Sequence, residues 1–176
     1  MRKSASLWLA AIVLVGGMIV GGTASVATAR GADRILEFDT MVGVPRPYTG
    51  SVNAIRGVPG GGLPWVVGSA KGELKVGGEI EVEVHGLVID PNDPAAITAG
   101  LAGTNPIPNF KAIVSCLSKD AAGVVATTVN VSTGLFPADA TGNSSIEDTV
   151  SLPQPCIAPI VFVTSPGGAW FTATGL

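Results

Sequence analysis

The sequence predicts an all-β fold, an antiparallel β-sandwich of seven to nine strands. Apolar and polar residues alternate along short runs, which is the period of a strand with one buried face. Clusters of turn-forming residues separate these runs, among them DPNDPAA, TNPIPN and PADATGN. After residue 29, no segment of ten or more residues keeps the 3.6-residue period of an amphipathic helix.

Candidate strands follow one another at the spacing of an all-β domain. The clearest is EIEVEVHGLVI, where Ile80, Val82 and Val84 point to one face and the charged residues to the other. Just before it, Gly77-Gly78 lies between two short runs and predicts a hairpin. The other candidates are RILEFDTM, GSVNAIRG, PWVVGS, FKAIVSCLS, GVVATTVNV, SSIEDTVSL, CIAPIVFVT and AWFTAT.

Three of these runs carry more specific information. FKAIVSCLS places Phe110, Ala112, Val114 and Cys116 on one face, and CIAPIVFVT is apolar on both faces, as a central strand is. In SSIEDTVSL, Asp148 falls on the apolar side of the strand, although burying a carboxylate is costly. A sheet edge or a β-bulge explains this position better than a functional buried acid does.

The first 29 residues have the three parts of a secretory signal peptide. Arg2 and Lys3 precede a 14-residue apolar block, residues 7–20, and small residues then lead to Ala27-Thr28-Ala29. We expect cleavage after Ala29 and export from a bacterium, with an uncleaved membrane anchor as the alternative. The expected organisation is a signal peptide at 1–29, an extended N-terminal segment at 30–48 and a sandwich domain at 49–176.

The composition limits the partners. Without Arg2 and Lys3, eight of the ten Lys and Arg remain beside thirteen Asp and Glu, so the mature net charge is 8 − 13 = −5. Such a chain does not attract nucleic acid or an anionic membrane surface. No cofactor is expected either. In RGVPGGGLPWVVGSAKG, Lys71 is followed by Gly72 rather than Ser or Thr, and Trp65 stands where a dinucleotide-binding motif needs glycine.

Cys116 and Cys156 are the only cysteines, and in an exported protein such a pair predicts one disulfide. Because each lies on or beside a predicted strand, the bond could tie the two sheets together, as in immunoglobulin domains. Those domains carry a tryptophan between the cysteines, whereas Trp65 and Trp170 lie outside this interval. The fold is therefore expected to be immunoglobulin-like in general architecture, not in motif.

The chain offers little for nucleophilic catalysis. Ser69 and Lys71 share a strand face but lack the G-x-S-x-G and S-x-x-K spacings. His85 is the only histidine, and Glu83 lies about 7 Å away along the same strand. Without an orienting acid and a nucleophile, a solvated surface histidine is the preferred interpretation.

Acidic residues suggest two weak sites. The glutamates of EIEVE could supply paired acids for glycoside hydrolysis, although a solubilising sheet face is the more common use of such a run. The DPNDP turn offers oxygen ligands of the kind that calcium binds, but a Pro/Asn/Asp turn explains it without a metal, and no metal site is expected. The residues concerned are Glu79, Glu81 and Glu83 in the first case and Asp90, Asn92 and Asp93 in the second.

Two glycine-rich elements resemble each other at the two ends of the predicted domain. Trp65 follows PGGGLP, and Trp170 follows SPGGA. Together with Tyr48, the two indoles could form an exposed platform that stacks on sugars or accepts a partner protein. The alternative, which we prefer, is that both tryptophans are core residues and that PGGGLP is a turn leading to a packed side chain.

The segments RGVPGGGLPWVVGSAKGEL, FKAIVSC and LPQPCIAPIVFVTSPGGAWF resemble those of small exported bacterial proteins of unknown function. The resemblance spans most of the mature chain. It implies export and a β-rich domain, and it supplies no catalytic residues.

These observations favour a non-enzymatic protein that binds a polysaccharide, a cell-envelope component or a protein outside the cytoplasm. The first alternative is a structural subunit that assembles through strand edges, or by donating its N-terminal segment ADRILEFDTMVGVPRPYTG to a neighbour. The second alternative is a secreted hydrolase.

Overall fold

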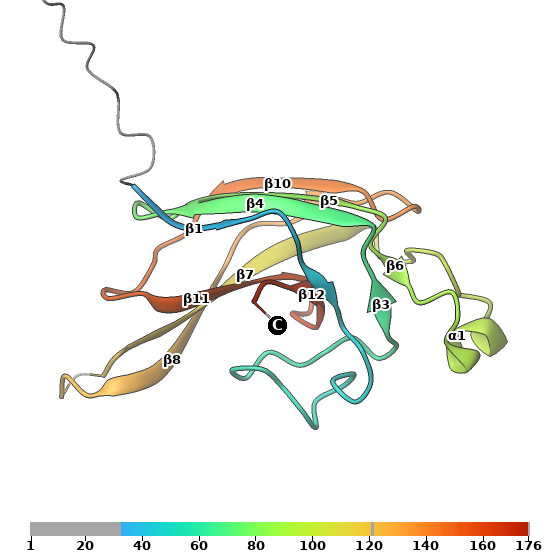
Figure 1. Ribbon diagram of the computed structural model, residues 1–176, viewed down its shortest axis with the longest axis horizontal. Helices are drawn as coiled ribbons and strands as arrows, with labels where there is room; N and C mark the ends of the chain where they lie inside the picture. The colour runs from blue at the N-terminus through green and yellow to red at the C-terminus, as the bar shows by residue number, and fades with distance from the viewer. Residues whose placement is uncertain (1–32, 121, 176) are drawn as a thin grey trace, which may run out of the picture.

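The computed structural model describes residues 33–120 and 122–175, which form two antiparallel sheets packed face to face (Figure 1). Four strands in spatial order make the first sheet: β1 (Arg34–Phe38), β4 (Ser69–Lys75), β5 (Glu79–His85) and β10 (Ser144–Thr149). Five make the main path of the second: β2 (Val42–Gly43), β12 (Trp170–Ala173), β11 (Ile157–Thr164), β7 (Asn109–Lys119) and β8 (Val125–Ser132). We call them sheet A and sheet B.

Three short strands and one helix complete the described residues. The strand β9 (Phe136–Pro137) pairs with β7, and β3 (Trp65–Val66) pairs with β6 (Val88–Ile89). The helix is α1 (Pro94–Ala99). Within the described part of the chain, eight of the twelve strands have four residues or more. The sequence did not predict the two-residue strands as such, because two residues are too few to show a period.

The all-β prediction is confirmed, and the inner faces are those that the alternation indicates. On β5, Ile80, Val82 and Val84 are buried between the sheets while the residues between them face outward. On β7, the predicted face of Phe110, Ala112, Val114 and Cys116 is wholly buried, with each side chain 0% exposed. Period-two patterning fixes the buried face of a strand, so these residues form the core.

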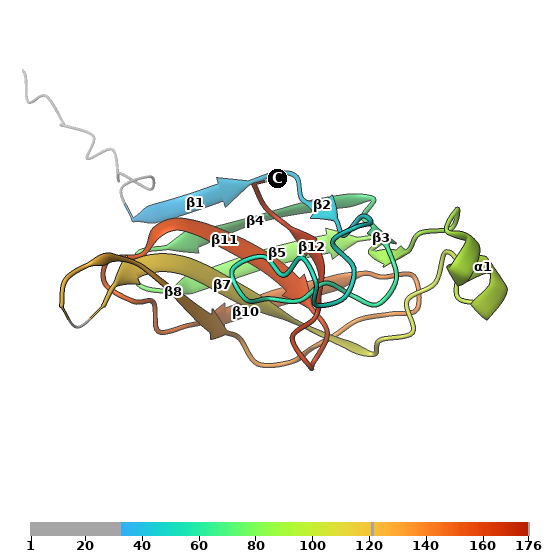
Figure 2. The ribbon, with the colours of Figure 1, turned by 90° about the horizontal axis from the view of Figure 1, so that it is seen from below.

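A third layer covers the outer face of sheet B. The segment 45–64 lies on the side of sheet B that faces away from sheet A (Figures 1 and 2). The backbone of Trp170 donates to Pro59 O and accepts from Gly61 N, each at 2.8 Å. This layer explains why β11 is apolar on both faces: Val161 and Val163 pair with core residues of β7, while Phe162 on the other face is also 0% exposed.

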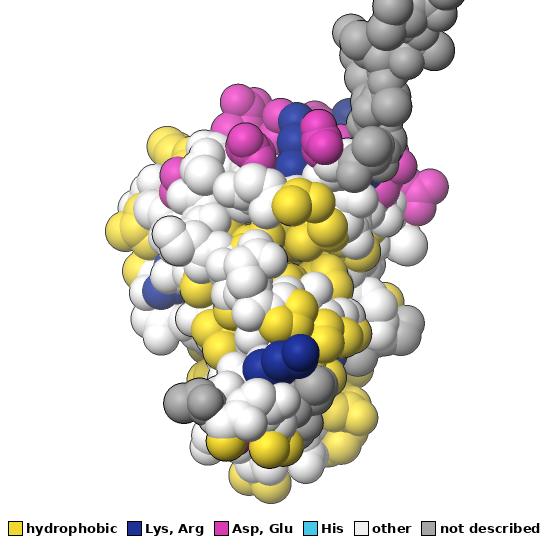
Figure 3. All heavy atoms as spheres, turned by 90° about the vertical axis from the view of Figure 1, so that its left-hand side faces the viewer, with side chains coloured by type: hydrophobic (Ala, Val, Ile, Leu, Met, Phe, Trp, Pro, Cys, Tyr) yellow, Lys and Arg dark blue, Asp and Glu magenta, His cyan; other side chains and the backbone are white. Residues whose placement is uncertain are grey.

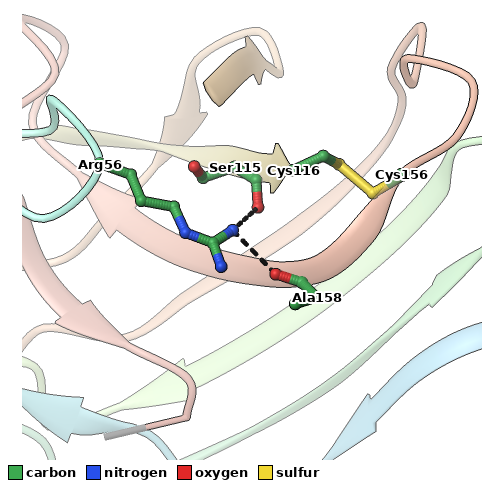
Figure 4. Close-up of a disulfide and its surroundings, with 5 residues drawn as sticks. All are labelled: Arg56, Ser115, Cys116, Cys156 and Ala158. Atoms are coloured by element: carbon green, nitrogen blue, oxygen red, sulfur yellow. Dashed lines mark hydrogen bonds between the residues drawn. A yellow bond between two sulfur atoms is a disulfide. The ribbon is translucent and has the colours of Figure 1, made fainter. Parts of the chain in front are cut away.

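The prediction that GSVNAIRG, residues 50–57, forms a strand is wrong. Residues 50–57 form turns in the segment that covers sheet B, with a single bridge between Ile55 and Val58. The backbone has positive φ angles at Gly50, Arg56 and Gly57, which an extended strand does not tolerate. Arg56 holds the segment in place, because its Nη1 donates to Ser115 O at 2.9 Å and to Ala158 O at 2.8 Å (Figure 4).

The disulfide Cys116–Cys156 is confirmed, with its Cα atoms 5.0 Å apart (Figure 4). The suggestion that it ties the two sheets together is wrong. Cys116 lies on β7 and Cys156 directly precedes β11, and these strands are neighbours within sheet B. The bond therefore joins adjacent strands of one sheet, an arrangement that depends on strand order and not on any local pattern.

The DPNDPAA cluster is a helix start as well as a turn. Asp93 is the N-cap of α1, and its Oδ1 accepts from Ala95 N at 3.1 Å and Ala96 N at 3.0 Å. Pro94 follows as the first helical residue and Gly100 closes the helix with a φ of 69°. An Asp-Pro pair followed by a C-terminal glycine is a recognised helix signature, but one short turn of helix shows no period.

Asp148 lies on the edge strand β10, so the edge interpretation is confirmed. Its side chain is half-buried, and Oδ2 accepts from Gly134 N while Oδ1 accepts from its neighbour Thr149 N, each at 2.8 Å. These backbone hydrogen bonds, that from Gly134 first, lower the pKa of Asp148. The carboxylate is therefore held in its charged form and stabilises the loop beside the sheet edge.

The described part of the expected N-terminal segment, residues 33–48, is not separate from the sandwich. Its β1 pairs with β4 in sheet A, and its β2 pairs with β12 in sheet B, so it contributes to both layers of the sandwich. The boundary expected after residue 48 therefore divides neighbouring strands of the same domain. The predicted signal peptide, its cleavage position at Ala29 and the alternative membrane anchor lie outside the described residues.

The hairpin predicted at Gly77-Gly78 is confirmed, since β4 and β5 pair in antiparallel register around it. Gly78 N donates to Lys75 O, and Gly78 has a φ of 93°. A Cβ atom on Gly78 would lie 1.9 Å from Val150 O, which is a backbone atom and cannot move away cheaply. Only glycine fits this position, because it needs both the left-handed backbone and the close approach.

We expect Gly78→Ala to lower the free energy of unfolding by at least about 2 kcal/mol, since backbone strain and a steric clash combine. Gly77→Ala is the matched control, because its Cβ would meet only the flexible end of the Glu79 side chain. That variant should stay within about 0.5 kcal/mol of the wild type in urea unfolding. Equal losses for the two variants would contradict this account of the turn.

Candidate functional site

A row of four glutamates crosses the outer face of sheet A. The register pairs Glu37 with Glu73, Glu73 with Glu81, and Glu81 with Glu147, so each strand contributes one residue. Directly opposed residues of an antiparallel pair point to the same face, about 4.5–5.5 Å apart at Cβ. Like charges at such positions repel one another, so this row is unfavourable for the isolated sheet.

Basic residues compensate one end of this glutamate row. Lys75 Nζ lies 3.0 Å from Glu73 Oε1, and Arg34 pairs with both Glu73 and Glu37. The hydrogen bond from Lys75 lowers the pKa of Glu73, and the same bond raises the pKa of Lys75. In the described part of the chain, neither Glu81 nor Glu147 forms an ion pair.

Glu83, in the next row, is held by two partners. Lys71 Nζ lies 2.7 Å from Glu83 Oε2, and His85 Nε2 lies 2.9 Å from Glu83 Oε1. These contacts, that with Lys71 first, lower the pKa of Glu83. Although Glu83 and His85 are two residues apart on the strand, their side chains bend toward each other and come into hydrogen-bond contact. Because Glu83 and His85 are partly or largely exposed, this pair is a surface contact and not a buried catalytic dyad.

A groove of about 620 Å³ lies along this face. Gly72, which has no side chain, lines this groove and pairs with Phe38 of β1 in the sheet register. A Cβ atom on Gly72 would lie 2.6 Å from Phe38 Cζ, so the absence of a side chain there makes room for the ring. The groove is lined by Glu37, Phe38, Asp39, Lys71, Gly72, Glu73, Glu81, Val82, Glu83, Ser145 and Glu147.

Acidic side chains dominate this side of the molecule. In Figure 3, Asp and Glu side chains gather along the top, where sheet A lies, and one group of basic atoms stands between them. Phe38 is half-buried, lines part of the groove and packs against the hydrophobic core. A row of carboxylates on an exposed face suits a cationic ligand, which these groups attract.

The proposed aromatic platform is not supported, because both indoles are buried. Trp65 is 4% exposed and stacks on Phe171, with ring centroids 3.9 Å apart. Trp170 is 0% exposed and packs near Phe162. The two glycine elements do meet, through a bridge between Gly60 and Trp170, but they meet inside the fold. Tyr48, at 39% exposed, is the one member of the trio that water reaches.

The residues considered for calcium binding, Asp90, Asn92 and Asp93, instead stabilise the turn and the start of α1. Asp93 is 6% exposed and caps α1, and Arg46 Nη2 lies 3.0 Å from its Oδ2. Burial alone would raise the pKa of Asp93, but hydrogen bonds from Ala96 N and from Arg46 outweigh it and lower that pKa. Asp90 Oδ1 accepts from Asn92 N at 2.9 Å. Among residues 33–120 and 122–175, no group of three or more His, Cys, Asp and Glu side chains is placed to hold a metal ion.

Sequence reasoning identified part of the groove. It singled out Glu79, Glu81 and Glu83 on β5, of which Glu81 and Glu83 line the groove. It missed Glu37, Phe38 and Glu147, because they belong to other strands and only the register brings them to β5. No single-strand pattern carries that information. Ser69 and Lys71 do share a face, but Lys71 is bound to Glu83 and does not activate Ser69.

Comparisons with protein-family models, with curated proteins and with solved structures gave no match. No residue role is therefore carried over from another protein. Within the described residues, no helix combines the length and apolar character needed to cross a membrane.

Proposed function

We propose that this protein is an exported, non-enzymatic binding protein whose groove on sheet A takes a cationic segment, rich in lysine or arginine, of a partner protein. The observation that carries the proposal is the glutamate row that crosses all four strands along the groove. Like charges in register cost stability, and a cationic partner relieves that cost. The uncompensated Glu81 and Glu147 are the residues that such a partner would neutralise.

Two further observations support a location outside the cytoplasm and a role in binding. The disulfide Cys116–Cys156 is consistent with an oxidising compartment outside the cytoplasm, in agreement with the predicted signal peptide. A pair of packed antiparallel sheets, immunoglobulin-like in general architecture, is a common scaffold for binding. Polysaccharide binding is less well supported, because the tryptophans that would stack on sugar rings are buried. A hydrolase is also less well supported, since Glu83 is engaged by Lys71 and His85.

The proposal predicts measurable binding of a hexalysine peptide by calorimetry at 0.15 M salt. The double variant Glu81→Gln/Glu147→Gln should raise the dissociation constant about tenfold, because two carboxylates no longer attract the peptide. Hexaglutamate should not bind.

Glu79→Gln is the matched control, since Glu79 lies on the same strand and face but does not line the groove. This variant should bind hexalysine within about twofold of the wild type. If it weakens binding as much as the double variant does, the attraction is a property of the net charge and the groove is not a site. Failure of the wild type to bind hexalysine would also refute the proposal.

Binding should also depend on pH. Carboxylates are charged above their pKa, so affinity should be full at neutral pH and fall on acidification. Because the pKa values of Glu73 and Glu83 are lowered, these two keep their charge below the ordinary glutamate value of about 4.3. Release of hexalysine between pH 7 and about pH 3, followed by calorimetry, checks the sign of this dependence.

A further inference from the structure

The edge of sheet B at β8 differs from the other sheet edges. On β10, the carboxylate of Asp148 holds the loop at Gly134 beside the strand. On β2, the backbone carbonyl of Trp65 lies so close to Gly43 that a Cβ atom there would be 2.1 Å from it. β1 has an irregular register between Arg34 and Leu36 and carries charged side chains. Coverage, bulges and charge are the usual means by which proteins protect sheet edges.

β8 has fewer of these protections: its register with β7 shifts once, near its first residues, between Ser118 and Lys119, and the Asn130 side chain donates to Arg56 O. It is eight residues long and reads VATTVNVS, with no charge, no proline and mostly β-branched residues. In the part of the chain that the structure describes, its backbone pairs with β7 and with no other strand. Figure 2 shows it as the outermost strand of its sheet, on the side away from β2. Its second edge therefore presents a row of backbone N–H and C=O groups that can pair with another strand.

We infer that this edge pairs with β8 of a second copy of the chain, antiparallel about a two-fold axis, so that two copies of sheet B become continuous. In such a symmetric contact each residue of β8 faces a residue of the same strand, and only the residue at the axis meets its own counterpart. A strand that carries several charges of one sign would therefore repel itself. The uncharged β8 meets this condition, whereas β10, with Glu147 and Asp148, does not. The second copy is therefore the partner that the composition of this edge fits.

The apolar residues at the ends of β8 support the same arrangement. Val124 precedes the strand and is 59% exposed, and Leu135 follows it and is 54% exposed. An antiparallel pair brings the beginning of one strand to the end of the other. Val124 then lies on the same side of the contact as Leu135 of the second copy, and burial of these side chains adds to the backbone hydrogen bonds.

Sedimentation velocity from about 5 to 500 µM tests this inference, which does not depend on the proposed groove. The wild type should pass from monomer to dimer as concentration rises. Thr128 is exposed in the middle of β8, near the axis, so Thr128→Lys and Thr128→Glu should each raise the dissociation constant at least tenfold. An equal mixture of the two variants should associate again, because opposite charges then meet.

Thr149→Lys is the control, since it places the same charge at an exposed position on the other edge strand, β10. It should dimerise as the wild type does. A wild type that stays monomeric to 500 µM would overturn the inference. So would a Thr128→Lys variant that associates normally, or a mixture of the two Thr128 variants that does not associate.

Discussion

Replacement of Trp170 by alanine should lower the free energy of unfolding by about 3–5 kcal/mol, the usual loss for a fully buried large aromatic side chain. Trp170 is 0% exposed between sheet B and the segment that covers it, and its ring centroid lies 6.0 Å from that of Phe162. The backbone bonds to Pro59 and Gly61 remain possible in the variant, so the loss reports the side chain. Urea unfolding measures it.

Replacement of Trp170 by phenylalanine should cost much less. The indole Nε1 is buried and has no hydrogen-bond acceptor among the described residues. Burying an unsatisfied donor costs about 1–3 kcal/mol, and phenylalanine removes that donor while keeping most of the apolar volume. We therefore expect Trp170→Phe to lie within about 1 kcal/mol of the wild type. A loss as large as that of the alanine variant would show that the indole N–H is required.

Removal of the disulfide should have an effect of similar size. The bond closes a loop between residues 40 apart in the sequence. The chain-entropy model assigns such a loop about 4 kcal/mol of stabilisation at 25 °C. At about 2–4 °C per kcal/mol for a domain of this size, Cys116→Ala/Cys156→Ala should lower the melting temperature by roughly 8–16 °C.

The control for this prediction is chemical reduction. The wild type in a strong reductant should melt at the temperature of the double alanine variant, and reductant should not change the variant itself. Because Cys116 is 0% exposed, reduction should be slow until the protein begins to unfold. A wild type whose melting temperature is unchanged after complete reduction would contradict the stabilising role of the bond.

Local sequence patterns were sufficient to predict which face of a single strand is buried. Alternation placed Ile80, Val82 and Val84 in the core because the period of a strand depends only on its own residues. The hairpin at Gly77-Gly78 and the pairing of the two cysteines were predictable for the same reason, since each needs a turn signal or a residue count and nothing distant.

Arrangements between strands were not predictable in this way. Glu37 and Glu147 are 110 residues apart and meet in one row only because four strands align in a particular register. The disulfide was assigned to two sheets because the order of strands in space is absent from local sequence. Residues 50–57 look like a strand in hydrophobic pattern, but the positive φ values at Arg56 and Gly57 make them a cover for sheet B.

The pairing of β2 with β12 has a consequence for the timing of folding. Residues 42–43 find their partners at 172–173, near the far end of the described chain. A chain that emerges from a ribosome or an export channel with its N-terminus first cannot make this pairing until those residues are released. Until then, Phe162 has no Trp170 beside it and the segment 45–64 has no strand edge to bind. Residues 170–173, which are released after the other strands of sheet B, therefore close the apolar interior to water. A chain that has not yet released them exposes that apolar surface to chaperones and proteases.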